Sequence, residues 1–327
     1  MNHPRRRATL TCLAAGLLTA ALPAVSAAAY PDKPIRLVVP FPPGQGADIL
    51  ARLIGQHLAA ALGQPIVVEN KVGAGGIIGT AFAAKAAPDG YTLYMGSSGP
   101  LAIGPHVYKA VGFDTLKDFA PISNIASVTQ VLVTAPASQL ASAKDVVERA
   151  RAQPGMVPFG SAGSGTTSHL TMELFTQMSG ISLSHVPYKG SSTSMIDVMA
   201  GRVPLMFDSL PGVLTNVKSG SLRAIAVASA QRDPLLPNVP PVAESGVPGF
   251  ATSGWIGLLA PARTPPQIVD QLHTAVAKAL KSEAVKKRMS ELAFTPIGNS
   301  PAEFQTFLSK EVALWGGVAA KAGVQKE

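Results

Sequence analysis

A strand, a glycine loop and a helix follow one another near the start of this chain, and the same arrangement recurs near its middle. The apolar run over 35–41 predicts a buried strand, the Pro/Gly cluster over 42–46 a tight loop, and the apolar positions spaced three or four residues apart over 50–62 a helix. Residues 156–169 repeat this order with a Gly/Ser loop. The first amide groups of a helix lack an intrahelical partner and carry the positive end of its dipole. Two such loops therefore predict two lobes that face one anionic ligand.

Length and element order predict two α/β lobes. A chain of 327 residues exceeds the usual size of a single hydrophobic core. After the first helix, strands are predicted over 64–70 and 91–95 with a helix over 78–87 between them, and strands connected in this way pair in parallel. Ligands of such sheets bind beyond the carboxyl ends of the strands. This places three loops at one edge of the sheet: 42–46, 73–76 and 96–99.

The later part of the chain is predicted to repeat the scheme and to close with helices. Residues 119–135 are strand-like, and we place the first crossing between the lobes there, with Trp255–Leu259 as the return crossing. Residues Ser300–Glu303 form a capping box with proline at the first helical position, so a helix is predicted to start there. Strands of the second lobe are predicted over 181–187, 203–207 and 222–228.

The first 29 residues have the three-part pattern of a secretory signal peptide. Basic residues at Arg5–Arg7 precede an apolar stretch over 10–25, and small residues follow at 26–29. The apolar stretch is short for a membrane span, and no other window approaches about 20 apolar residues. We therefore expect residues 1–29 to be removed and the mature protein to be exported, by the general secretory route rather than the twin-arginine route.

Cysteine content and charge exclude several classes of function. The single cysteine, Cys12, lies within the predicted signal segment, so we expect no disulfide, thiol nucleophile or thiolate metal site in the mature chain. Removal of the three signal arginines leaves 24 basic and 19 acidic residues, a net charge of +5. These basic residues are scattered, which argues against nucleic acid and fits an anionic ligand or plain solubility.

Known catalytic and cofactor motifs match poorly. A dinucleotide fingerprint needs G-x-G-x-x-G, and residues 44–49 supply only its first two glycines. The nucleophile elbow G-x-S-x-G is absent. Spacing alone does not exclude a triad that uses Ser161 or Ser164 with His169, although loop serines beside glycines are more often donors or caps. His169 is either functional or a helix-start histidine that bonds its own loop. No two histidines have metal-ligand spacing, so we expect neither a metal nor a cofactor.

Short motifs occur in a fixed order along the chain. They lie at 30–36 (YPDKPIR), 68–71 (VENK), 73–76 (GAGG), 87–93 (APDGYTL), 160–165 (GSAGSG), 185–190 (HVPYKG), 206–208 (MFD), 222–227 (LRAIAV), 236–240 (LPNVP), 255–258 (WIGL) and 301–304 (PAEF). Through these motifs residues 30–327 resemble the substrate-binding proteins of tripartite tricarboxylate transporters, the Bug family.

The resemblance implies a fold and a function. The fold is the type II periplasmic-binding-protein fold, in which two doubly wound α/β lobes are joined by two crossing strands around a ligand cleft. We assign 30–128 and 255–327 to lobe I, with the C-terminal helices packed back on it, and 129–254 to lobe II. The function implied is capture of a small carboxylate (a di- or tricarboxylate, an amino acid or an aromatic acid) in the periplasm and its delivery, by a monomer, to membrane permease subunits. An exported ligand sensor that feeds a signalling partner and, less favoured, an exported hydrolase stay as alternatives.

Family members hold a carboxylate between the loops at 41–48 and 161–167. Asp208 is a candidate to accept a hydrogen bond from a hydroxyl or ammonium at the far end of the ligand, or it caps the next helix. Gln45 replaces the second of two adjacent glycines that the family usually has, and it either reaches into the cleft as a specificity determinant or points away. The candidate ligand-binding residues are Phe41, Pro43, Gly44, Gln45, Gly46, Asp48, Ser97, Ser98, Ser161, Gly163, Ser164, Gly165, Thr166, Thr167, His169, Tyr188 and Asp208.

Overall fold

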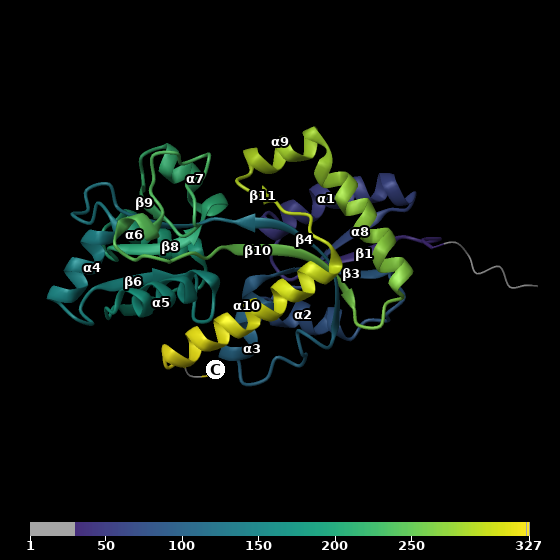
Figure 1. The fold of residues 1–327 in the computed structure, drawn as a ribbon, viewed down its shortest axis with the longest axis horizontal. Helices are drawn as coiled ribbons and strands as arrows, with labels where there is room; N and C mark the ends of the chain where they lie inside the picture. Colours follow the sequence, from purple (N-terminus) through teal and green to yellow (C-terminus); the bar gives the residue numbers. More distant parts are fainter. Residues whose placement is uncertain (1–29, 325, 327) are drawn as a thin grey trace, which may run out of the picture.

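The computed structural model describes residues 30–324 and 326, which form two α/β lobes, each built on its own sheet (Figure 1). The predicted signal segment and Cys12 lie outside the described residues. Lobe I has a six-stranded sheet in the order β11 (Thr295–Pro296), β4 (Phe119–Val128), β10 (Gly254–Pro261), β3 (Thr92–Ser97), β1 (Ile35–Val39) and β2 (Ile66–Asn70). Lobe II has a five-stranded sheet in the order β7 (Ser184–Pro187), β6 (Pro158–Ser161), β8 (Leu205–Ser209), β5 (Gln130–Thr134) and β9 (Arg223–Val227).

Parallel pairing holds where a helix connects the strands, as predicted. In lobe I, β1 pairs in parallel with β2 and with β3; in lobe II, β6 pairs in parallel with β7 and with β8. The segments that cross between the lobes enter each sheet from the opposite end, so β10 runs antiparallel to β3, and β5 runs antiparallel to β8 and β9. The carboxyl ends of the parallel strands in both lobes therefore supply the loops of one cleft.

Two segments cross between the lobes. The predicted strand over 119–135 is β4 followed by β5, with only Thr129 between a strand of one sheet and a strand of the other. The return segment leads into β10, which pairs only within the sheet of lobe I, while the Thr252 N–H just before it still donates to the Ala228 carbonyl of lobe II at 2.9 Å. The exact lobe boundaries at 128/129 and 254/255 stay a prediction.

Helices cover both faces of each sheet. On lobe I, one face carries α1 (Gly46–Leu62), α8 (Pro266–Lys281) and α9 (Glu283–Glu291), and the other carries α2 (Ile77–Ala84) and α10 (Pro301–Lys321). On lobe II, one face carries α6 (Ser191–Met199) and α7 (Leu210–Lys218), and the other carries α4 (Ala143–Ala152) and α5 (Thr167–Ser179). None of the helices within the described residues is both long and apolar enough to cross a membrane.

The last helix, α10, packs on lobe I and also reaches lobe II. It starts at the predicted capping box, where the Ser300 N–H donates to Glu303 Oε2 at 2.8 Å. It then runs diagonally below the sheets from lobe I to α5 of lobe II (Figure 1), where Gln177 Nε2 donates to the Val318 carbonyl at 2.8 Å. One hydrophobic core, with Phe159 from lobe II and Tyr94 and Trp315 among its members, continues beneath both sheets.

Local differences from the prediction have local causes. The helix predicted over 78–87 is α2, which ends at Ala84 and is preceded by a 3₁₀ turn, η1 (Ala74–Gly76). The loop predicted at 96–99 leads at once into helical turns that were not predicted, η2 (Gly99–Ile103) and α3 (Gly104–Val107). Each begins with proline at its first turn, where the missing N–H is not needed.

Candidate ligand-binding cleft

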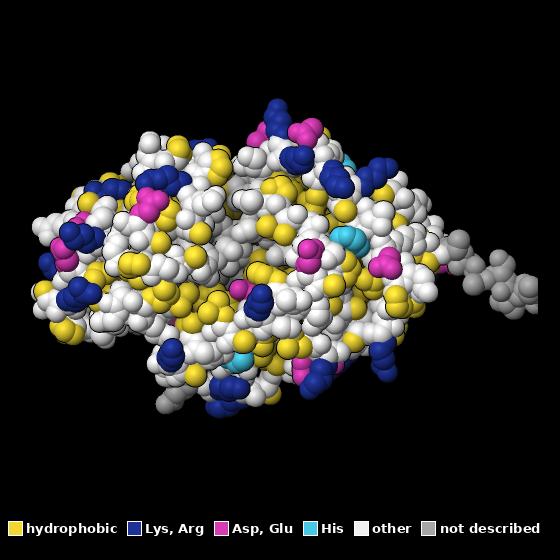
Figure 2. Space-filling model, in the orientation of Figure 1, with side chains coloured by type: hydrophobic (Ala, Val, Ile, Leu, Met, Phe, Trp, Pro, Cys, Tyr) yellow, Lys and Arg dark blue, Asp and Glu magenta, His cyan; other side chains and the backbone are white. Residues whose placement is uncertain are grey.

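A cavity of about 950 Å³ lies between the lobes. The loops predicted at 42–46, 73–76 and 96–99 meet on its lobe I side, which confirms that the carboxyl ends of β1, β2 and β3 share one edge. The lobe II side is lined by residues of 162–168, 189–195 and 208–215. In the space-filling view the surface is hollowed between the lobes, and most Lys and Arg side chains stand at the periphery of this face (Figure 2).

Four helix N-termini converge on this cavity. First-turn residues of α1 and α5 line it from opposite lobes, and first-turn residues of α6 and α7 line it beside α5. Each N-terminus presents the positive end of a helix dipole and N–H groups without intrahelical partners. The cavity is therefore a favourable environment for negative charge, although Lys189 is the only basic residue in its lining among the residues that the structure describes.

On the lobe I side, the loop before α1 uses some of its amides and leaves others free. The Gly44 N–H donates to Asp48 Oδ2 at 2.9 Å and the Gln45 N–H to the Pro42 carbonyl at 3.3 Å. Gly44 has φ +83, which favours glycine at this turn. The next N–H groups, those of Gly46 and Ala47, have no acceptor among the described residues and face the cavity. These two amides are free donors of the loop at the start of α1.

Asp48 holds this loop from below and does not line the cavity. Its buried carboxylate accepts hydrogen bonds from the Gly44 N–H, from Arg52 Nε and Nη2 at 3.0 and 2.9 Å, and from Asn70 Nδ2 at 2.9 Å. Burial by itself would raise the pKa of Asp48, but the hydrogen bonds from Arg52, Gly44 and Asn70 hold it below its ordinary value. Asn70 also donates to the Phe41 carbonyl at 2.9 Å. The strand–loop–helix unit is thus held as one rigid piece.

On the lobe II side, the Gly/Ser loop is bonded mostly to itself. The N–H groups of Ala162, Gly163 and Gly165 donate to Ser168 Oγ, Ser161 Oγ and His169 Nδ1 at 3.2, 3.1 and 3.1 Å. The helix cap is Thr166, whose Oγ1 accepts the His169 N–H. Within the described chain the Thr167 and Ser168 N–H groups find no acceptor, and both residues line the cavity.

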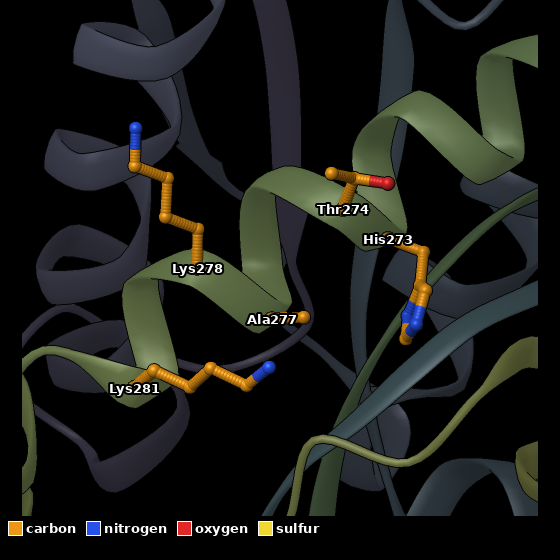
Figure 3. Close-up of a pocket in the computed structure, with 5 residues that line it drawn as sticks. All are labelled: His273, Thr274, Ala277, Lys278 and Lys281. Carbon is orange, nitrogen blue, oxygen red and sulfur yellow. The ribbon is translucent and has the colours of Figure 1, made fainter.

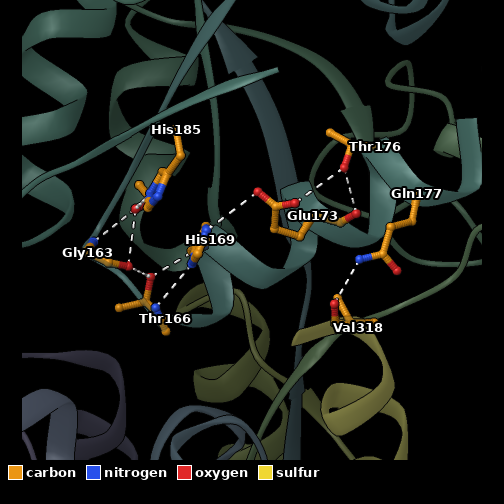
Figure 4. A network of polar contacts seen from close by, with 10 residues as sticks. Gly163, Thr166, His169, Glu173, Thr176, Gln177, His185 and Val318 are labelled. Atoms are coloured by element: carbon orange, nitrogen blue, oxygen red, sulfur yellow. Dashed lines mark hydrogen bonds and ion pairs between the residues drawn. The ribbon is translucent and has the colours of Figure 1, made fainter. Parts of the chain in front are cut away.

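A pair of stacked histidines lies beside this loop (Figure 4). The ring centroids of His169 and His185 are 3.8 Å apart and the rings are inclined by 8°, and the Phe159 ring lies near both, at 4.9 Å from His185 and 6.2 Å from His169. Ser161 Oγ lies 2.6 Å from His185 Nε2, and His169 Nε2 lies 3.5 Å from Glu173 Oε1. Burial, followed by the neighbouring His169, lowers the pKa of His185 to about 3. Of the two interpretations of His169, the structure supports the histidine that bonds its own loop.

The lobes touch at the floor of the cavity. Ser98 Oγ of lobe I and Thr167 Oγ1 of lobe II are 3.2 Å apart. Beside them Gly165, with φ +70, lies so close to Val107 that an added Cβ would come within 2.4 Å of its side chain. Both contacts connect the Gly/Ser loop of lobe II to the segment that follows β3.

Ten of the predicted site residues line the cavity: Phe41, Gly44, Gln45, Gly46, Ser97, Ser98, Gly165, Thr166, Thr167 and Asp208. Gln45 is exposed there and makes no cap hydrogen bond, which favours the cleft-facing alternative for it. Seven do not line it: Pro43, Asp48, Ser161, Gly163, Ser164, His169 and Tyr188. Of these, Tyr188 turns its hydroxyl to Asp197 Oδ2 at 2.6 Å. Ligand contact by these seven stays a prediction that the geometry does not favour.

Several lining residues were missed. They include Lys189, Gly190 and Ser191 of the loop before α6, for which a signal was available in the serines that follow a glycine and precede an apolar helix. No local signal places Leu292 and Phe294 in the cavity, because they come from the chain after α9 and reach it only through the packing of lobe I.

A second, smaller hollow of about 380 Å³ lies on the surface of α8. All its lining residues come from that one helix, and the side chains of Lys278, Thr274 and His273 point in different directions (Figure 3). They do not converge on a common point, so this hollow is not a built site.

Two α/β lobes, two crossing segments and a polar cleft at the strand ends define a substrate-binding protein of the type II periplasmic class. A family model described as the tripartite tricarboxylate transporter family receptor (TctC) matches residues 50–324. The chain belongs to this family. Protein BugT of Bordetella pertussis is 39% identical over 302 residues, which are 92% of this chain and 93% of BugT.

Solved structures are similar over nearly the whole chain. The R. palustris protein Rpa4515 with adipate is 38% identical and has a TM-score of 0.83 over 91% of this chain and 100% of that one. MatC from Rhodopseudomonas palustris with bound malate is 29% identical and has a TM-score of 0.78 over 88% of this chain and 99% of that one.

Proposed function

We propose that this protein captures a small carboxylate in the cleft between its lobes and delivers it to membrane permease subunits of a tripartite tricarboxylate transporter, after export to the periplasm. Ligand binding closes the lobes about the two crossing segments, and the permease recognises the closed form. Gln45, exposed at the cavity at a position where the family resemblance implies glycine, is proposed to contribute to ligand choice. The solved relatives that hold adipate and malate support a carboxylate ligand.

One observation carries this proposal. The N-termini of α1 and α5 come from opposite lobes, and each presents free N–H groups to the same cavity, those of Gly46 and Ala47 on one side and those of Thr167 and Ser168 on the other. A carboxylate placed between them accepts hydrogen bonds from both lobes, each contributing roughly 1.5–3 kcal/mol when water is excluded. Such a ligand stabilises the closed arrangement because only that arrangement offers both sets of donors.

The hydrolase alternative is less favoured by the geometry. Ser161 and His185 are in contact, as a nucleophile and a base would be. However, Ser161 is fully buried and does not line the cavity, and within the described residues no carboxylate forms an ion pair with His185. The Ser161 hydroxyl instead forms hydrogen bonds with the Gly163 backbone in its own loop. If the wild type hydrolysed esters and Ser161→Ala did not, the hydrolase alternative would be favoured over the binding function.

Thermal unfolding against a ligand panel tests the proposal. The signal-free protein is unfolded and refolded to remove any carried ligand, and then heated with mono-, di- and tricarboxylates, aromatic acids and the methyl esters of each. A ligand at a hundred times its dissociation constant adds about 2.7 kcal/mol to the free energy of unfolding, which raises the midpoint by a few degrees. We expect at least one acid to raise it and its ester not to. Equal shifts with acid and ester, or shifts with neutral compounds only, would contradict a carboxylate site.

A matched pair of variants at the start of α1 tests the amide donors. Gly46→Pro removes one free N–H at a helix position that accepts proline, and Gln45 before it already has the extended backbone that proline requires. Gly46→Ala keeps the N–H and adds the same Cβ, 3.3 Å from Phe294. We expect Gly46→Pro to weaken binding of the acid about tenfold or more, and Gly46→Ala to weaken it much less.

A further inference from the structure

Asp208 has a buried oxygen that the fold does not satisfy. It lies at the carboxyl end of β8, where α7 begins, and it lines the cavity although its residue surface is only 5% exposed. Oδ1 accepts the Ser209 N–H at 2.7 Å, whereas Oδ2 is buried and has no hydrogen-bond partner among the described residues. A buried carboxylate oxygen without a hydrogen-bond donor destabilises the fold. This unpartnered oxygen belongs to a residue that lines the ligand cavity.

The position of Asp208 places it beside the carboxylate donors of lobe II. Strand β8 pairs in parallel with β6, the strand that leads into α5, and neighbouring strands lie about 5 Å apart. The first turn of α7 therefore lies next to the first turn of α5 at the same edge. A ligand whose carboxylate meets α1 and α5 can reach Asp208 through a short carbon chain.

We infer that Asp208 recognises the end of the ligand remote from its bound carboxylate, and that tight binding requires a hydrogen bond between that end and Oδ2. This inference rests on the proposed function and specifies the ligand class for it. A hydroxyl or ammonium group supplies the hydrogen itself, and a methyl end supplies none. The preferred ligands are therefore carboxylates with a hydrogen-bond donor at the far end.

A second carboxylate at that end meets Asp208 only if the two share a proton, because two ionised carboxylates in contact repel each other. The charged groups that face the cavity are Lys189, on the loop before α6, and Glu291, at the end of α9, which is paired with Arg288 at 2.9 Å. Lys189 is thus the basic side chain that lines the cavity among the described residues. Burial raises the pKa of Asp208 to about 6, against the opposing effect of the hydrogen bond from the Ser209 N–H to Oδ1. A dicarboxylate is therefore expected to bind with uptake of a proton at neutral pH.

Calorimetric titration with matched acids tests the inference. The probes are 5-hydroxypentanoate against hexanoate, the shorter pair 3-hydroxypropanoate against butanoate, and adipate. We expect the wild type to bind the hydroxy acid of at least one pair tenfold or more tightly than its methyl partner. Asp208→Ala should reduce that ratio to about one. Adipate titrated at pH 7.5 in two buffers of different ionisation enthalpy should take up a proton with the wild type and none with Asp208→Asn.

Controls separate this inference from the proposed function. Glu244→Gln removes an exposed charge of lobe II outside the cavity and should change neither the ratio nor the proton uptake. Circular dichroism establishes that each variant is folded, and Asp208→Asn keeps the side-chain volume if Asp208→Ala does not fold. If no carboxylate binds the wild type, the proposed function fails. If carboxylates bind but the ratio is near one in the wild type, or is unchanged in the folded variants, the Asp208 inference alone is overturned.

Discussion

At the scale of single residues, His185 shows how the polar groups beneath the cleft depend on staying uncharged. Its ring stacks on that of His169 and lies beside that of Phe159, and it contacts Ser161, whose hydroxyl accepts the Gly163 N–H. A proton on His185 would place a charge against the neighbouring imidazole and Phe159 ring. Its pKa is lowered to about 3 because burial, and then His169, disfavour the charged form.

This lowered pKa predicts a pH dependence of stability. His185 takes up a proton near its ordinary pKa of about 6.5 in the unfolded chain, whereas the folded residue stays neutral down to a pH of about 3. The contribution of His185 to the free energy of unfolding is therefore fully present above pH 6.5 and is lost as the pH falls toward 3. We expect the free energy of unfolding, measured with urea, to fall by about 1 kcal/mol from pH 7.5 to pH 5 through this residue, a value halved for screening of the partly exposed ring.

The His185→Asn variant should be less stable at both pH values and should lose less stability between them. The matched control, His57→Asn on α1, removes a histidine distant from the stacked pair. A full pH dependence retained in His185→Asn would mean that other groups cause it.

At the scale of elements, α10 is fastened to the return crossing by one carboxylate. Glu311 Oε2 on α10 accepts hydrogen bonds from the indole N–H of Trp255, near the start of β10, at 2.9 Å and from that of Trp315 at 3.0 Å. Both indoles are buried, and burial raises the pKa of Glu311 despite these bonds. The helix thus holds the segment through which the chain re-enters lobe I.

Removal of this carboxylate leaves two buried donors without an acceptor. We expect Glu311→Ala to lower the free energy of unfolding by about 2–4 kcal/mol and Glu311→Gln, which keeps an acceptor oxygen, by less than half of that. Urea unfolding measures both. Lys310→Ala, on the exposed side of the same helix, is the control and should change stability by less than about 0.5 kcal/mol. A loss in Glu311→Ala no larger than in this control would show that the two hydrogen bonds contribute little.

At the scale of the whole molecule, two sheets share one hydrophobic core. Leu132 and Phe207 of lobe II belong to the same buried cluster as Val38 and Leu259 of lobe I, and α10 adds Phe304 from below. The lobes are therefore connected by more than two crossing segments. We expect a motion that opens the cleft to leave this shared layer in place, because its contacts lie on the opposite face of each sheet from α6, α7 and α9.

A shared core predicts cooperative unfolding. We expect urea to unfold both lobes in one transition, with the same midpoint by far-ultraviolet circular dichroism and by tryptophan fluorescence. Trp255 and Trp315 are the only tryptophans and both belong to the shared core, so fluorescence reports on the junction of the lobes while circular dichroism reports on both. Two separated transitions would mean that each lobe is stable without the other.

The sequence by itself determined the order of elements, the pairing of helix-connected strands and the loops that meet at the cleft. These features are local: alternation of apolar runs with glycine loops predicts strand, turn and helix, and parallel pairing then brings the loops after β1, β2 and β3 to one edge. For the same reason Phe41, Ser98 and Thr167 were correctly expected to line the cavity.

Tertiary structure decided which groups in those loops remain available. Asp48 and Ser161 occur in the predicted loops, yet both turn away from the cavity, because Arg52 and Asn70 hold the first and His185 the second. Which amides stay free depends on such bonds between residues distant in the sequence. Spacing along the chain specifies neither these bonds nor the unsatisfied oxygen of Asp208, because a hydrogen bond is decided by positions in space that only the packed lobes define.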